Sequence, residues 1–454
     1  MKRNKAKIIV IGILLVVVVI LVAGFIYMNP ILPIITGYSA KNLASGLFVA
    51  GRTQESLENT DLNFSFIKYN KNKIDWDKKE VRSSFLWHRS KAIYIDGYGC
   101  SLVNDFKKDE MLNRPYQKVK IIPENQDTIP WPAGDLIAGS IPAGVNMDKL
   151  NAAISKAFAD TIPHKGTFAV MVVYKGQPIV EKYKTGLSSE NRFLSWSMAK
   201  SVTNALTGIL VKEGKLDINK PIGFAEWQND DRKNITINNL MHMNSGLAWN
   251  EDYGNQSDVN NMLHKEGDFG TFTLNKSLES PIGTVWNYSS GTTNIVSLII
   301  RQTIGNDSEY YAFPRNALFN KIGMRSAICE VDASGTFVGS SYIYASIRDY
   351  ARFGLLYLNN GNWLGEQILP EGWAEFSATE AKGSDGQYGA FFWINKSGIF
   401  YPDVPRDMYC CRGHDGQYIY IIPSKQLVVV RTGFSKKGTF DLNEFLSEIA
   451  NSFE

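Results

Sequence analysis

The chain has 454 residues, which is enough for two or three domains and a sizeable hydrophobic core. Its formal net charge is only +3 and no long basic or acidic run is present, so nothing points to a nucleic-acid partner. Five histidines are present and none belongs to an HExxH-like cluster. We therefore expect neither a metal site nor another cofactor.

The N-terminus has the pattern of a membrane anchor. Four basic residues within positions 1–7 precede an uncharged apolar run at 8–27, which at 20 residues is long enough to span a bilayer as a helix. The positive flank should stay in the cytoplasm, which predicts a single-pass protein of the cell membrane with its main domain on the periplasmic or extracellular side. A cleaved signal peptide is the alternative, but Leu21-Val22-Ala23 is a poor cleavage site.

The next two segments carry no chemical motif. Residues 28–115 contain strand-like runs at 63–69, 83–88 and 92–95, separated by polar and glycine-rich breaks, and predict a small β-rich region. Residues 116–145 are rich in proline and glycine and are interpreted as a linker.

Residues 146–454 form the predicted main domain, in which helical patterns in the middle are flanked by strand patterns near both ends. One helix is expected to begin near Asp148, and further helices are expected at 201–212, 237–242, 292–304, 347–359 and 440–453. Strands are expected at 168–174, 178–184, 416–423 and 426–432. The two strands at 168–174 and 178–184 should form a hairpin. This order favours an α+β fold, with an antiparallel sheet flanked by helices.

The four cysteines are Cys100, Cys329, Cys410 and Cys411. In an exported protein they could be oxidised, and buried free thiols are an equally good interpretation. The adjacent pair could bridge only with strain, and the sequence does not fix any pairing.

The most informative stretch is Ser197-Met198-Ala199-Lys200. Residues three apart on a helix share a face, so Lys200 could take the proton of the Ser197 hydroxyl if its pKa is lowered. The spacing alone is a weak signal, because Ser65-Phe66-Ile67-Lys68 has it too, within a predicted strand. A site therefore needs further parts in the right order.

Two later stretches supply such parts. Tyr288-Ser289-Ser290 ends a turn that leads directly into an apolar helix. His414-Asp415-Gly416-Gln417 opens a late strand, and Gly416 would let the backbone approach a ligand closely. Tyr357-Leu358-Asn359 is an alternative to the Tyr288 stretch by its letters, but it ends an apolar helix, where packing explains it.

Together the three stretches resemble the serine β-lactamase and penicillin-binding-protein superfamily, in particular its class C-like branch. That branch includes DD-carboxypeptidases, family VIII-type esterases and 6-aminohexanoate-dimer hydrolases, and its motifs occur in the order SxxK, YxN or YSx, and KTG or HxG. The resemblance covers about residues 146–453 and implies a β-lactamase/transpeptidase-like fold.

The resemblance also implies a mechanism. Ser197 would attack an ester or amide carbonyl, and Lys200 would accept the proton or pass it to Tyr288. Tyr288, drawn toward the phenolate by the charge of Lys200, would carry the proton to the leaving group. The backbone N–H groups of Ser197 and Gln417 would form an oxyanion hole, worth roughly 3–4 kcal/mol per donor.

The departures from the family motifs bear on the substrate. Ser290 replaces the asparagine that orients β-lactam side chains, and His414 and Asp415 replace the lysine and threonine that hold a substrate carboxylate. With Gly416 and Tyr253, these residues are the expected substrate contacts, and Asp415 would repel an anionic substrate. We expect an exported serine hydrolase of small esters or amides. The alternatives are a DD-carboxypeptidase or β-lactamase, or a non-catalytic envelope binding protein of the same fold.

Overall fold

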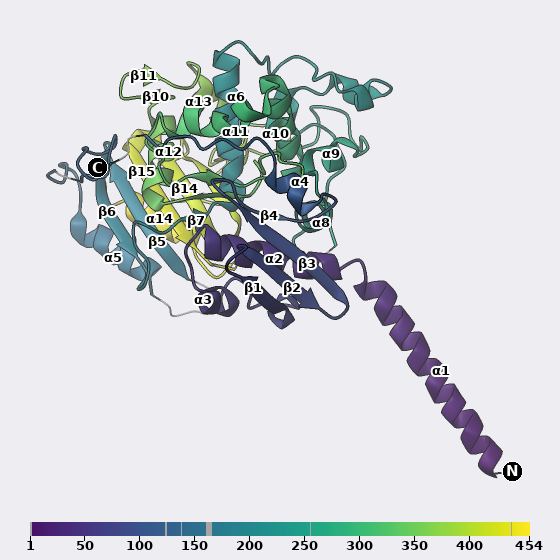
Figure 1. Ribbon diagram of the computed structural model, residues 1–454. Coiled ribbons are helices and arrows are strands. Elements are labelled where there is room, and N and C mark those ends of the chain that lie inside the picture. Colours follow the sequence, from purple (N-terminus) through teal and green to yellow (C-terminus); the bar gives the residue numbers. More distant parts are fainter. Residues whose placement is uncertain (1, 123–124, 138, 160–165, 255, 437) are drawn as a thin grey trace.

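The computed structural model describes residues 2–122, 125–137, 139–159, 166–254, 256–436 and 438–454. Helix α1 (Lys2–Met28) projects away from the rest of the chain (Figure 1). Its stretch Lys7–Met28 is 22 residues long, apolar enough to cross a membrane, and not buried against the rest of the protein. Length and composition are equally compatible with a signal sequence.

The N-terminal region combines a sheet with a buried helix. Four antiparallel strands lie in the order β1 (Lys71–Asp75), β2 (Glu80–Phe85), β3 (His88–Ile95) and β4 (Gly99–Leu102), and α2 (Leu32–Phe48) packs on β2, β3 and β4. The region also contains α3 (Gln54–Asn59), the short turn η1 (Ile67–Tyr69) and α4 (Lys108–Leu112).

Two details of this region differ from the sequence prediction. The strand expected at 63–69 is wrong, because this stretch forms turns that end in η1. Helix α2 was not predicted, because it is buried around most of its circumference and so has no polar stripe. Its one charged residue, Lys41, is buried in an ion pair with Glu330 of the main domain.

The main domain is built on a six-stranded antiparallel sheet in the order β12-β13-β14-β15-β5-β6. The strands are β5 (Thr167–Tyr174), β6 (Gln177–Tyr183), β12 (Trp393–Ile394), β13 (Tyr409–Gly413), β14 (Gln417–Ile422) and β15 (Leu427–Gly433). Strands β14, β15 and β5 are apolar almost throughout, because both faces of the sheet are covered.

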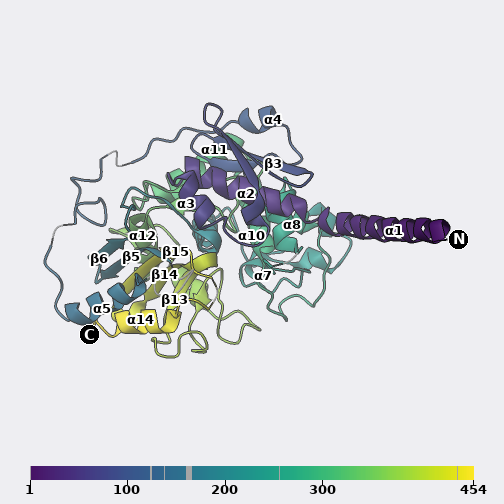
Figure 2. The same ribbon diagram turned by 90° about the horizontal axis from the view of Figure 1, so that it is seen from below.

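Alternate residues of β5 belong to two different cores. Val170 and Val172 pack with α5 (Met147–Ala157) and α14 (Leu442–Ala450), which lie together on one side of the sheet (Figure 2). Ala169 and Met171 pack into the larger core on the opposite face, which includes α12 (Ile347–Leu358). This period of two follows from the strand pleat.

The remaining elements of the main domain are helices and short strands. They are α6 (Ala199–Lys212), α7 (Ile237–Met241), α8 (Asp258–Lys265), α9 (Phe269–Leu274), α10 (Ser290–Ile304), α11 (Asp307–Phe313), α13 (Trp373–Ala378), β7 (Phe193–Leu194), β8 (Ile328–Cys329), β9 (Ile343–Ala345), β10 (Asn362–Trp363) and β11 (Glu366–Gln367). In the described part of the chain the short strands form two further antiparallel sheets, β7-β9-β8 and β10-β11. The predicted hairpin, the predicted helices and the α+β fold with an antiparallel sheet are confirmed. All four cysteines are buried free thiols.

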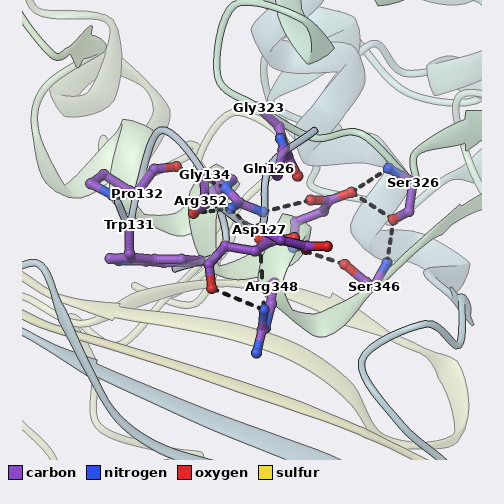
Figure 3. A network of polar contacts seen from close by, with 12 residues as sticks. Gln126, Asp127, Trp131, Pro132, Gly134, Gly323, Ser326, Ser346, Arg348 and Arg352 are labelled. Carbon is purple, nitrogen blue, oxygen red and sulfur yellow. Dashed lines mark hydrogen bonds and ion pairs between the residues drawn. The ribbon is translucent and has the colours of Figure 1, made fainter. Parts of the chain in front are cut away.

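Part of the predicted linker packs on α12 through a buried polar network (Figure 3). The Arg352 guanidinium donates to the carbonyl oxygens of Pro132 at 2.9 Å and Gly134 at 2.7 Å, and it lies 4.6 Å from the Trp131 ring centroid. Gln126 Nε2 donates to the Gly323 carbonyl at 2.9 Å. These contacts hold the chain against the main domain; the domain boundaries themselves stay a prediction.

Candidate active site

Ser197 lies in the one-turn helix η2 (Trp196–Met198), directly before α6. The preceding Trp196 has φ of +44°, a left-handed conformation that is strained for a bulky residue. The turn is held by Ser195, whose N–H donates to the Ile343 carbonyl at 2.8 Å and whose hydroxyl accepts from the Ile343 N–H at 3.1 Å. Strain that neighbouring contacts maintain is common at active sites.

Lys200 lies one turn further along and is the centre of the site. Its Nζ donates to Ser197 Oγ at 3.1 Å, Ser290 Oγ at 2.9 Å and the Ser340 carbonyl at 3.0 Å. The side chain is only 1% exposed, and burial lowers its pKa to about 8, against the opposing influence of Glu251. About a tenth of the lysine is then neutral at pH 7, and a neutral amine can accept the Ser197 proton.

Glu251 was not among the predicted site residues, yet its carboxylate joins Ser290, Tyr253 and Trp249 beside this lysine. Its Oε1 accepts from Ser290 Oγ at 2.5 Å and from Tyr253 OH at 3.1 Å. Its Oε2 accepts from the Ser290 N–H at 2.9 Å and from Trp249 Nε1 at 2.5 Å. The available signal was a glutamate between two aromatic residues, but a local pattern cannot show that Ser290 lies beside it.

Tyr288 lies against the same lysine. Its ring centroid is 4.9 Å from Lys200 Nζ, and Trp286, Tyr388 and Trp393 surround it at 5.4 to 6.4 Å between centroids. These ring contacts hold the half-buried Tyr288 ring in place beside Lys200.

The expectation that Lys200 would draw Tyr288 toward the phenolate is wrong. Burial, followed by the charge of Glu251, raises the pKa of Tyr288 far above its usual value, and a hydrogen bond with Ser197 opposes this only in part. Tyr288 is therefore a neutral hydroxyl that can donate a proton. The alternative Tyr357 is buried, and its hydroxyl donates to Asn204 Oδ1 at 2.5 Å in the core.

The third stretch lies between β13 and β14. The His414 ring stacks on Tyr253 with centroids 4.9 Å apart and meets Trp196 edge-on at 5.7 Å. His414 Nε2 is 3.2 Å from Asp415 Oδ1, and burial raises the pKa of that carboxyl. The structure thus brings Tyr253 and His414 together beside the turn that carries Ser197.

Gly416 and Gln417 have evident structural roles. Gly416 has φ of +96°, and a Cβ there would lie 2.3 Å from a guanidinium nitrogen of Arg431, so close packing already requires glycine. The Gln417 side chain is held by the Gly433 backbone, with Nε2 donating to its carbonyl at 2.6 Å. The roles of Gln417 and Ser197 in an oxyanion hole stay predictions.

A profile of the Beta-lactamase family matches residues 158–441, which is more than half of the chain and includes all three motifs. The chain therefore belongs to that family, and its fold is the β-lactamase/transpeptidase-like α+β fold.

Among proteins similar to this chain is the 6-aminohexanoate-dimer hydrolase of Paenarthrobacter ureafaciens, which is 25% identical over 242 residues, or 50% of this chain. The match spans 61% of that relative's length. A Bacillus anthracis protein provisionally named as a 6-aminohexanoate-dimer hydrolase matches in structure with a TM-score of 0.57 and 24% identity, covering 74% of this chain and 89% of that one. A family VIII carboxylesterase matches with a TM-score of 0.53 and 14% identity, covering 70% and 98%.

Proposed function

We propose that the protein is an exported serine hydrolase that cleaves small esters or amides through an acyl-enzyme at Ser197. The observation that carries the proposal is the contact between Ser197 Oγ and the Nζ of a buried Lys200 whose pKa is lowered to about 8. An ordinary solvated lysine would be protonated and could not act as a base.

The contacts in the site support an acylation step in which each proton has a donor and an acceptor among these residues. Neutral Lys200 takes the proton of Ser197 as Oγ bonds to the substrate carbonyl carbon, and the backbone N–H groups of Ser197 and Gln417 hold the oxyanion. As the intermediate collapses, the Tyr288 hydroxyl protonates the departing alcohol or amine and recovers a proton from Lys200. Water then attacks the acyl-enzyme, with the proton transfers reversed.

The contacts of Ser290 support a substrate other than a β-lactam. Its hydroxyl already joins Lys200 to Glu251, which favours a role in positioning the lysine over direct contact with substrate. Tyr253, His414 and Asp415 lie beside the site as candidate substrate contacts. Similarity to a 6-aminohexanoate-dimer hydrolase and to a carboxylesterase agrees with amide or ester substrates.

We further propose that α1 anchors the protein in the cell membrane with the hydrolase domain outside the cytoplasm. The length and apolar composition of Lys7–Met28, and the basic residues that precede it, support this orientation.

The test is labelling with a fluorophosphonate and turnover of p-nitrophenyl acetate by the full-length protein. Both should disappear in Ser197→Ala. The control is Ser188→Ala, because Ser188 is exposed and does not line the site or the cavities of the protein. Labelling that survives in Ser197→Ala, or a folded wild-type protein that neither reacts nor turns over ester, would refute the proposal. The second result would favour a binding protein.

A further inference from the structure

A large cavity is lined both by the end of the anchor helix and by residues that flank the candidate active site. Its volume is about 770 Å³. At one end its walls are apolar residues of the anchor and the start of α2, including Ile26, Ile31 and Ile34; the side wall includes Phe64 and Phe66.

The cavity is also lined by the predicted substrate contacts. Tyr253, His414 and Asp415 line it, as does Trp196. The stacked rings of Tyr253 and His414 form part of its wall, and the His414 ring contacts Trp196, the residue before Ser197. One cavity therefore extends from apolar side chains at the end of α1 to the polar residues expected to contact substrate.

The domain presents an aromatic face around the same helix. Trp87 stacks on Phe25 of the anchor with centroids 4.9 Å apart. Phe85 beside it contacts Phe66 at 6.1 Å and Tyr69 at 6.4 Å. Trp87 and Tyr69 remain about half exposed. Tryptophan and tyrosine at such positions favour the boundary between a bilayer and water, so we expect this face to lie on the membrane from which α1 emerges.

We propose that the cavity binds the acyl chain of an amphiphile taken from that leaflet, with the ester or amide of the amphiphile at Ser197. The proposal rests on the proposed hydrolase function and names its substrate class. The cavity is continuous with the anchor helix, which favours a lipid chain over a water-soluble apolar peptide. A ligand that leaves the bilayer would meet Ile26 and Ile31 first. The bond broken is that between the acyl carbonyl and its alcohol or amine.

The first experiment does not depend on turnover. The full-length protein is reconstituted in phosphatidylcholine vesicles that contain a phospholipid with a photoreactive diazirine on its acyl chain. After irradiation, peptides from α1 should be labelled in every sample and serve as the internal standard. Peptides that contain Phe64–Phe66 and Tyr253 should also be labelled, and Ile34→Trp, which puts a larger side chain into the apolar part of the cavity, should reduce that labelling at least fivefold. Labelling confined to α1 would overturn the proposal.

The second experiment compares p-nitrophenyl acetate with p-nitrophenyl hexanoate. Burying the four added methylenes should raise kcat/KM at least tenfold in the wild-type protein. Ile34→Trp and Ile31→Trp should remove this preference and leave acetate turnover within twofold. The control Leu112→Trp, an exposed position outside the cavity lining, should change neither substrate.

These two readouts separate the two proposals. The acyl-chain site is overturned if kcat/KM is equal for both esters, or if the two cavity variants lose kcat/KM equally for both esters. Acetate turnover would still support the hydrolase in either case. Cavity labelling without any turnover in the wild-type protein supports an acyl-chain site and refutes the hydrolase.

Discussion

Replacing Glu251 by glutamine should move the pH dependence of hydrolysis to lower pH. Glutamine keeps the shape and an acceptor oxygen for the Ser290 hydroxyl. It removes one negative charge, and its amide nitrogen replaces the oxygen that accepts from the Ser290 N–H and Trp249 Nε1. That charge raises the pKa of Lys200, whereas burial lowers it. Without Glu251 the lysine should therefore lose its proton at a lower pH than the wild-type value of about 8.

The size of the shift follows from the contacts that separate the two charges. Ser290 Oγ lies 2.9 Å from Lys200 Nζ and 2.5 Å from Glu251 Oε1. The charges are therefore at most about 5.4 Å apart, and at that separation and an effective dielectric constant near 20 their interaction is about 3 kcal/mol. Since about 1.4 kcal/mol corresponds to one pKa unit, a downward shift of about two units is expected.

The assay is kcat/KM for p-nitrophenyl acetate between pH 5 and pH 9, with spontaneous hydrolysis subtracted. Activity should rise as Lys200 is deprotonated, so a lower pKa moves the rising limb to lower pH; the plateau should fall because the base is weaker. Asp252→Asn is the control, since it removes an exposed charge one residue away. An unchanged limb in Glu251→Gln, or one displaced to higher pH, would refute the assignment of Lys200 as the base.

Three further results are expected. Lys41→Met should lower the free energy of unfolding by about 3–5 kcal/mol in chemical denaturation, because it leaves the buried Glu330 carboxylate without its counter-charge. The double variant Lys41→Met/Glu330→Leu should recover stability, and a double variant that does not would contradict this cause. Gly413→Ala should reduce kcat/KM at least tenfold, since the new Cβ would lie 2.2 Å from the Ser195 carbonyl oxygen and displace the turn before Ser197; normal turnover would contradict this. A thiol reagent should detect four cysteines after unfolding and none before, whereas fewer than four would indicate a disulfide.

The parts of the site predicted from sequence depend on local patterns. The spacing of Ser197 and Lys200 on a helix start, and the turns that carry Tyr288 and His414, can each be recognised within a few residues. Their order along the chain then indicated the family, and the structure brings Ser197, Lys200 and Tyr288 into contact. The α+β fold was predictable for the same reason, because the strands and helices of the main domain have clear periodicities.

What the sequence did not predict depends on contacts between distant segments. Glu251 is 39 residues from Ser290, and only the folded chain shows that it accepts from that hydroxyl. The neutral state of Tyr288 likewise follows from burial among aromatic side chains, which a motif does not record. Helix α2 escaped prediction because it is buried on nearly all sides and therefore has no amphipathic pattern.

The contacts of Lys200 favour a working enzyme over a binding protein that has lost catalysis. If the altered second motif had only lost an asparagine, the buried ammonium of Lys200 would have one hydrogen-bond acceptor fewer, which is costly. Instead Lys200 Nζ contacts three oxygens, from Ser197, Ser290 and Ser340. Glu251 adds a compensating charge through Ser290. An arrangement that keeps a buried lysine beside a serine hydroxyl, with its pKa near 8, is what proton transfer requires and what simple binding does not.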